Sequence, residues 1–242
     1  SAEQLAALST AQMASLTTAQ VGVLSAGQLA ALSTTNLDAM GTAAFAKLSS
    51  AQVAALTTEQ VANLETADVA ALGTAAVKGL GGEALAALGT AQAAAFTTAQ
   101  MASLTSAQVA AFETADLAAM SAADITALGV LGLKGLSAAQ VAGLTSAQVA
   151  GLSTAQVGSL TAEQLTGLGT ANLVALTSAQ VAALTGAQVA SLSSTQLGAM
   201  ETADLKALST TALRALAADQ LSNLGTGQIA SLSTGQVAAL SA

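Results

Sequence analysis

Pairs of carboxylates are the side chains of this sequence that could carry out chemistry. Three eight-residue segments begin with Glu and have Asp three residues later, and a Lys or Arg follows each pair within two further segments. Such pairs could act in acid–base or glycosidic chemistry, or they could favour a helix dipole and pair with cations of an adjacent coil. Lateral contact between molecules through matched acidic and basic patches is a third interpretation. The residues are Glu65, Asp68, Lys78, Glu113, Asp116, Lys134, Glu201, Asp204, Lys206 and Arg214.

Charge contacts, between coils or between molecules, are the interpretation that we adopt for these residues. No aromatic sugar platform and no pocket-forming insertion accompanies the pairs, which disfavours a catalytic role. Calcium sites of the EF-hand or β-roll type need a dense set of Asp and Gly residues that is missing here. Asp38 and Lys47 form a fourth, looser instance of the pattern. We therefore expect no catalytic residue, no metal site and no cofactor.

The composition restricts the function further. The chain has no His and no Cys, so it lacks the usual general base near neutral pH, the thiolate nucleophile and the best zinc ligands. A net charge of −8 with five Lys plus Arg disfavours nucleic acid as a partner. The mean hydropathy is +0.65, yet polar residues interrupt every apolar run before it is long enough to span a bilayer, so no transmembrane helix is expected. The absence of His and Cys disfavours most enzyme classes.

The elements that must position these residues are repeats of eight residues, called octads below. Cutting before the Ser or Thr that usually follows Leu gives SAEQLAAL, STAQMASL and so on to STGQVAAL, without an insertion or deletion. Thirty octads make one repeat array over residues 1–242, without distinct capping units. Neither terminal octad departs from the consensus, so we expect either that the natural protein continues or that ends stack on ends.

Each octad carries a helix-start signal. Position 1 is Ser or Thr in 19 octads, position 4 is Gln in 19, and together they form a capping box. Large apolar residues at positions 5 and 8 form the predicted core. These apolar residues are spaced alternately 3 and 5 residues apart, so on one continuous helix they would not stay on the same face. We therefore predict separate short helices that only stacking can stabilise.

The predicted fold is therefore an all-α, tight solenoid of very short capped helices, one per octad. Small residues at positions 3, 6 and 7 let neighbouring backbones approach closely, and three or four octads are expected to complete one coil. A β-solenoid is the alternative, because Thr and Val are frequent, but the octad lacks the alternation of a strand. The least regular octad, residues 129–136, has lost both cap and Gln, and predicts either a bend or tolerated drift.

Two octads carry a resemblance to a known kind of repeat. LTTEQVAN and LTSAQVAA resemble the LTTxQVAAL-type octapeptide repeat tracts of very large bacterial surface and secreted proteins, including adhesin-like chains. The resemblance covers the whole sequence and implies an extracellular or cell-surface location. LTSAQVAAL is also similar to the opening of TAL-effector DNA-binding repeats, but the longer period and the base-reading pair of that family are missing, so its DNA activity is not expected here.

The leading hypothesis is a non-enzymatic structural protein, a cell-surface rod or self-assembling filament subunit that acts as a spacer or scaffold. Its expected partner is itself, end to end or laterally, and other surface proteins are left open. The alternative is a repeat-based binding module, adhesin-like, for a protein, a glycan or ice. Rows of Thr would suit ice, although helix capping already explains them.

Overall fold

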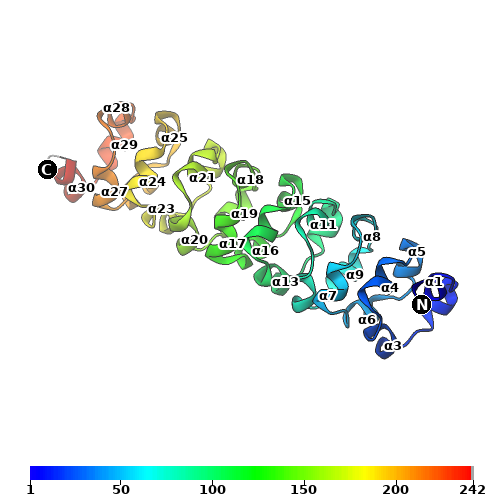
Figure 1. Ribbon diagram of the computed structural model, residues 1–242. Helices are drawn as coiled ribbons and strands as arrows, with labels where there is room; N and C mark the ends of the chain where they lie inside the picture. Colours follow the sequence, from blue (N-terminus) through cyan, green and yellow to red (C-terminus); the bar gives the residue numbers. More distant parts are fainter. Residues whose placement is uncertain (241–242) are drawn as a thin grey trace. The chain divides into compact units, whose positions relative to one another are not determined.

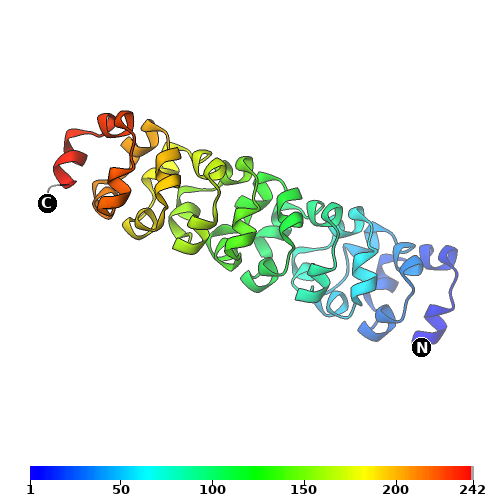
Figure 2. The same cartoon turned by 90° about the horizontal axis from the view of Figure 1, so that it is seen from above.

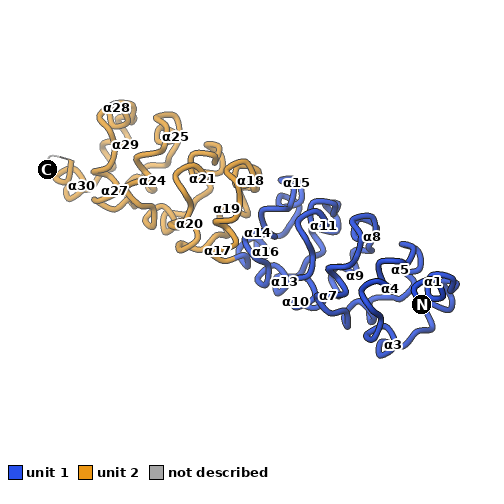
Figure 3. Tube along the Cα trace, viewed as in Figure 1, with its two compact units in different colours: residues 1–128 blue, residues 129–242 orange. Residues whose placement is uncertain are grey.

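A computed structural model describes residues 1–240, and this part of the chain forms thirty short helices and no strand (Figure 1). The prediction of an all-α solenoid with one helix per octad is confirmed, and the β-solenoid alternative is wrong. Contacts between residues divide the chain into two compact units, Ser1–Leu128 and Gly129–Ala242 (Figure 3).

The helices of unit 1 start at position 2 of their octads and span four to six residues. They are α1 Ala2–Ala6, α2 Thr10–Ala14, α3 Thr18–Gly22, α4 Ala26–Ala30, α5 Thr34–Asp38, α6 Thr42–Phe45, α7 Ser50–Ala54, α8 Thr58–Ala62, α9 Thr66–Ala71, α10 Thr74–Val77, α11 Gly82–Ala86, α12 Thr90–Ala94, α13 Thr98–Ser103, α14 Ser106–Ala110, α15 Thr114–Ala119 and α16 Ala122–Ala127.

The helices of unit 2 follow the same plan, except that the first begins at position 1 of its octad. They are α17 Gly129–Gly135, α18 Ala138–Ala142, α19 Ser146–Gly151, α20 Thr154–Ser159, α21 Ala162–Gly167, α22 Thr170–Val174, α23 Ser178–Ala182, α24 Gly186–Ser191, α25 Ser194–Ala199, α26 Thr202–Ala207, α27 Thr210–Arg214, α28 Ala218–Ser222, α29 Thr226–Ser231 and α30 Thr234–Leu240.

The predicted capping boxes set the helix starts. At α8, the Thr57 hydroxyl accepts a hydrogen bond from the Gln60 backbone amide at 3.1 Å, and the Gln60 side chain accepts one from the Thr57 amide at 2.9 Å. Two of the backbone donors that every helix start leaves free are thereby satisfied. Each octad can therefore end one helix and begin the next without help from a long loop.

The predicted core columns are buried. Position 5 is fully shielded in most octads, as at Val61, Leu117 and Leu165, which are all 0% exposed. Position 8 lies at the rim of the core, as at Leu64, which is 4% exposed. Phe96 and Phe112 both occupy position 8 and pack edge to face, with ring centroids 5.6 Å apart. Helices this short are unstable alone, so this burial supplies most of their stability.

Each helix packs against the helix three octads away. Figure 2 shows, within each unit, the short helices following one another in successive coils. In unit 1, α12 packs against α15, and in unit 2, α18 packs against α21. Hydrogen bonds between coils join residues 28 apart, or 28/8 = 3.5 octads, as from Gln60 to Leu32. A coil therefore closes between three and four octads.

The irregular octad of residues 129–136 lies where unit 2 begins. Its helix α17 begins at Gly129, which has a positive φ of 64° that few residues other than glycine adopt. Unit 1 contains a second such glycine, Gly41, with φ of 73° at the start of α6.

In neither unit does a helix of the described residues have the length and apolar character needed to cross a membrane.

Candidate functional site

The glutamine at position 4 connects successive coils. In α13 the side chain of Gln100 is 1% exposed, and its Oε1 accepts a hydrogen bond from the Thr97 backbone amide at 2.7 Å. Its Nε2 donates to the carbonyl oxygens of Val69 at 2.8 Å and Leu72 at 2.7 Å. One amide therefore caps its own helix and also satisfies carbonyls that the end of α9 leaves free.

The same bond recurs throughout both units, always from Nε2 to the position-8 carbonyl 28 residues earlier. The glutamines that make this bond in the same unit as its acceptor include Gln52, Gln60, Gln92, Gln100, Gln108, Gln164, Gln180, Gln188, Gln196, Gln220, Gln228 and Gln236. This series of glutamines is called the glutamine ladder below.

The ladder is not apparent from the octad pattern alone. Glu would complete a capping box as well as Gln does, so the preference for Gln was a usable signal. Repulsion between stacked carboxylates is one reason to avoid Glu. The structure adds a more direct one, because an amide can accept from its own cap and also donate to the preceding coil, whereas an ionised carboxylate can only accept.

The acidic octads replace the ladder glutamine with a shorter side chain that has no N–H. Asp116 accepts from the Glu113 backbone amide at 3.3 Å, and Asp204 accepts from the Ser178 hydroxyl, 26 residues earlier, at 2.8 Å. Asp116 and Asp204 are 2% and 5% exposed. Burial raises the pKa of Asp116, the hydrogen bond from the Glu113 backbone lowers it, and the Glu113 charge raises it. At position 4, aspartate thus takes the place of a neutral donor inside the stack.

Asp68 is the most perturbed of these acids. It is 2% exposed, and burial together with the negative charges of Glu65 and Asp38 raises its pKa to about 6. Asp38 is the last residue of α5, and burial and the Glu65 charge raise its pKa as well. Asp38 Oδ1 is buried and has no hydrogen-bond partner. The structure therefore brings these three acids together.

The other predicted site residues are exposed. Glu65, Glu113 and Glu201 occupy helix caps. The cations lie at helix C-termini, where the helix dipole favours positive charge, as with Lys78 at the C-cap of α10 and Arg214 in the last turn of α27. Lys134 and Lys206 occupy the last turns of α17 and α26. Charge contacts between coils or molecules stay a prediction for this set.

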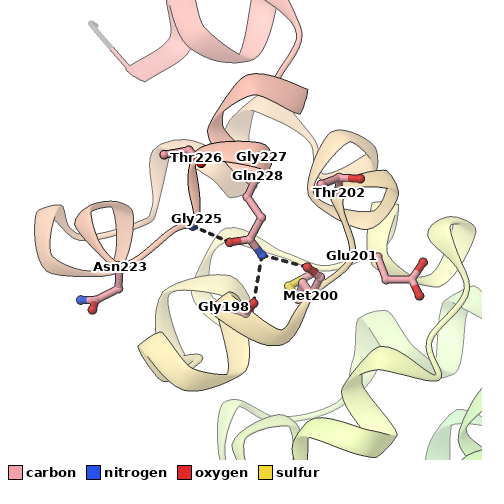
Figure 4. Close-up of a pocket in the computed structure, with 9 residues that line it drawn as sticks. All are labelled: Gly198, Met200, Glu201, Thr202, Asn223, Gly225, Thr226, Gly227 and Gln228. Carbon is pink, nitrogen blue, oxygen red and sulfur yellow. Dashed lines mark hydrogen bonds between the residues drawn. The ribbon is translucent and has the colours of Figure 1, made fainter.

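A crevice of about 730 Å³ lies beside Glu201 (Figure 4). Gln228 lines it, and its side chain accepts from the Gly225 amide at 2.8 Å and donates to the Met200 carbonyl at 2.8 Å. The side chains of Glu201 and Asn223 point away from Gln228 in this view. Backbone groups and the hydroxyls of Thr202 and Thr226 therefore offer hydrogen bonds in the crevice.

The repeat itself produces this crevice. Unit 1 has a smaller one of about 280 Å³ around Gln60, which occupies position 4 of its octad just as Gln228 does. Gly227 lines the larger crevice where Glu59 lines the smaller one, and Gly198 takes the place of Ala30. Smaller side chains at equivalent positions therefore widen the crevice in unit 2.

Comparison with protein families agrees with the octad arrangement. The family model described as the ALTTAQ repeat matches the chain eight times, and the matches extend over most of its length. They cover residues 2–34, 34–66, 61–98, 85–114, 109–145, 132–162, 162–194 and 197–234. The octapeptide type of repeat expected from the resemblance is thereby confirmed. A search of curated proteins gave no match.

Proposed function

Because this chain belongs to the ALTTAQ repeat family, we propose that it is a non-enzymatic structural protein, a spacer or scaffold whose length is set by the number of octads. The observation that carries the proposal is the glutamine ladder. Equivalent hydrogen bonds between coils make each octad interchangeable with its neighbours, and such arrays behave as sums of nearest-neighbour interactions. A spacer needs this property, and an active site does not.

Two further observations support the proposal. The buried aspartates at positions 116 and 204 are bonded to an amide and a hydroxyl inside the stack, where they have a structural role. The chain also has no His and no Cys. The location at a bacterial surface or in a secreted assembly rests on the resemblance to repeat tracts of surface proteins, and the excess of acidic residues gives no support for a nucleic-acid partner.

We expect deletion of a whole octad from unit 2 to be tolerated. Removing residues 177–184 keeps the octad frame, so every later helix meets an equivalent neighbour and the melting temperature changes by only a few degrees. Thermal unfolding followed by circular dichroism measures this effect. The distance between two spin labels placed on either side of the deletion within unit 2 should become shorter, as expected of a spacer.

The control is deletion of residues 181–184, which removes half as many residues. It truncates α23 and removes Val181 and Leu184 from the core, so it should cost about 3 kcal/mol or more, which corresponds to roughly 6–12 °C in melting temperature. If the whole-octad deletion is as harmful as the half-octad deletion, octads are not interchangeable and the spacer proposal fails.

Self-association through the core columns is the second part of the proposal. At position 5, Ile229 and Val237 are 42% and 52% exposed, whereas Val181 in the same column is 0% exposed. The same column is covered by octads elsewhere in the array, and octads of a second copy of the chain would cover it in the same way. The two molecules would then pack through the same apolar residues that pack between coils within one chain.

We expect the apparent mass in sedimentation velocity to rise with protein concentration, and the substitution Val237→Asp to weaken this association at least tenfold. Val23→Asp is the matched control, because Val23 is 83% exposed at position 7, outside the core columns. Equal effects of the two substitutions, or a constant monomer mass up to high concentration, would count against self-association.

The wide crevice around Gln228 favours a second candidate function, a binding module for a protein or glycan. Its volume of about 730 Å³ and its glycine lining distinguish it from the equivalent crevice around Gln60. NMR titration with oligosaccharides and peptides tests this function. Shifts confined to the amides of Gly198, Gly225 and Gly227 would support binding, and their absence would leave only the scaffold.

A further inference from the structure

Asp68 occupies the place of a ladder glutamine. One octad earlier, Gln60 donates to the carbonyls of Leu29 at 2.9 Å and Leu32 at 2.8 Å. By the same register, the carbonyls opposite Asp68 belong to Leu37 and Met40. An ionised aspartate cannot donate a hydrogen bond, so these acceptors lose the partner that the repeat supplies elsewhere.

Other aspartates at position 4 accept a hydrogen bond from a serine hydroxyl. Asp124 accepts from the Ser121 hydroxyl at 2.6 Å, and Asp204 accepts from the Ser178 hydroxyl at 2.8 Å. The residue that corresponds to Ser178 in the octads around Asp68 is Thr42, which follows Gly41 with its positive φ of 73°. Within the described residues, the structure gives the Asp68 carboxyl no hydrogen bond. A polar side chain this deeply buried normally has a partner.

Asp38 supplies the second half of the site. The ladder amide also approaches the carbonyl 30 residues earlier, as from Gln100 to Ala70 at 3.4 Å. The backbone carbonyl of Asp38 stands in that relation to Asp68, which places Asp38 opposite Asp68, and the side-chain Oδ1 of Asp38 is buried without a partner. The buried Oδ1 of Asp38 and the buried side chain of Asp68 both lack a hydrogen-bond donor, so the two carboxyls can bond to each other only when at least one of them carries a proton.

The remaining charges around Asp68 do not neutralise it. Helices α6 and α12 pack against α9. The octad of α6 contributes the exposed Lys47, and the octad of α12 contains no ionisable residue. Glu65, the cap of α9, and Asp38 are the charges that act on Asp68, and both are negative. The surroundings therefore favour the protonated form.

We propose that the Asp38–Asp68 carboxyl pair is a proton-operated joint between α5 and α9, closed when the pair holds a proton and loosened when both carboxyls are ionised. In acid, the protonated carboxyl donates a hydrogen bond to the other carboxyl of the pair, and this bond joins the two coils in place of the bond that glutamine donates elsewhere in the ladder. At higher pH, two negative charges face each other and this hydrogen bond is lost. The joint regulates how tightly two coils of unit 1 are held, whether or not the array is a spacer.

The pKa gives the pH range of the effect. Folding raises the pKa of Asp68 from the usual value of about 3.9 to about 6, so the folded chain holds the proton more tightly than the unfolded chain. The resulting stabilisation is present in acid and is lost as the pH rises from about 4 to above 6. A difference of about two pKa units corresponds to roughly a 100-fold change in the opening equilibrium of the joint.

Hydrogen exchange of the intact chain tests the joint. We expect the protection factors of amides in α5 and α9 to fall by up to roughly 100-fold between pH 4 and pH 8. Asp68→Asn retains the size of the side chain and donates at every pH, so it should keep high protection at pH 8. Asp38→Asn removes one negative charge and should move the midpoint of the transition to lower pH.

Two results would overturn the proposal. One is a wild-type pH profile identical to that of Asp68→Asn. The other is recovery of full protection at pH 8 by added Ca²⁺ alone, which would make the pair a cation site. The NMR titration of the Asp68 carboxyl carbon in the wild-type chain does not depend on a variant that folds. Its midpoint should lie near 6, and a midpoint near the ordinary value of about 3.9 would also refute the joint.

Discussion

Replacing Gln100 by Glu is expected to destabilise the coils around α9 and α13 by about 3–5 kcal/mol at neutral pH. The substitution keeps the shape of the side chain and the oxygen that accepts from the Thr97 amide. It removes the Nε2 that donates to the carbonyls of Val69 and Leu72. At 1% exposure, the new carboxylate would face two carbonyl oxygens without water. A buried charge in that position has no favourable partner.

Gln12→Glu is the matched control. Gln12 occupies the same octad position, but it is exposed, and its side chain accepts from the Ser9 amide at 2.9 Å within its own helix. Glu can still accept that hydrogen bond and carries its charge in water, so we expect a change within about 0.5 kcal/mol. Hydrogen exchange of α9 and α13 amides measures the effect locally, because a repeat array need not unfold in one step. Equal losses in both variants would mean that the ladder contributes little.

Much of the fold could be predicted from the octad alone. Ser or Thr at position 1 with Gln at position 4 sets where helices begin, and the apolar columns at positions 5 and 8 set which face is buried, because both effects act within a few residues. The helix cap at Thr57 and the burial of Val61 follow directly. Local rules were sufficient wherever the contact partners lie in the same octad.

The candidate site could not be predicted in the same way, because its contacts depend on the coil period. Asp38 and Asp68 belong to different coils, on α5 and α9, and nothing within either octad indicates that they meet. A period between three and four octads fixes this pairing, and that period results from the backbone path of the whole coil. The second role of Gln100 was hidden for the same reason, since its acceptors at Val69 and Leu72 belong to another coil.

Gly79 is another residue whose decisive contact lies in a different coil. It occupies position 7, where other octads carry mostly Ala, otherwise Ser, Gly, Asn, Lys or Val, so the sequence column suggests that residues of many kinds are tolerated. In the structure, a Cβ on Gly79 would overlap the backbone oxygen of Ser50 and lie 3.1 Å from the Ala54 backbone nitrogen. Both atoms belong to α7, against which α10 packs. The backbone cannot give way as a flexible side chain could.

We therefore expect Gly79→Ala to cost about 2–3 kcal/mol, because α10 must move away from α7 to accommodate one methyl group. Gly82→Ala is the control from the next octad. Its new Cβ would lie 3.6 Å from the Ala111 Cβ, an ordinary contact, and alanine favours the helical backbone of α11. This second substitution should be neutral or stabilising by up to about 1 kcal/mol. Chemical denaturation measures both changes, and a Gly79→Ala chain as stable as wild type would show that α7 and α10 are less closely packed than the structure indicates.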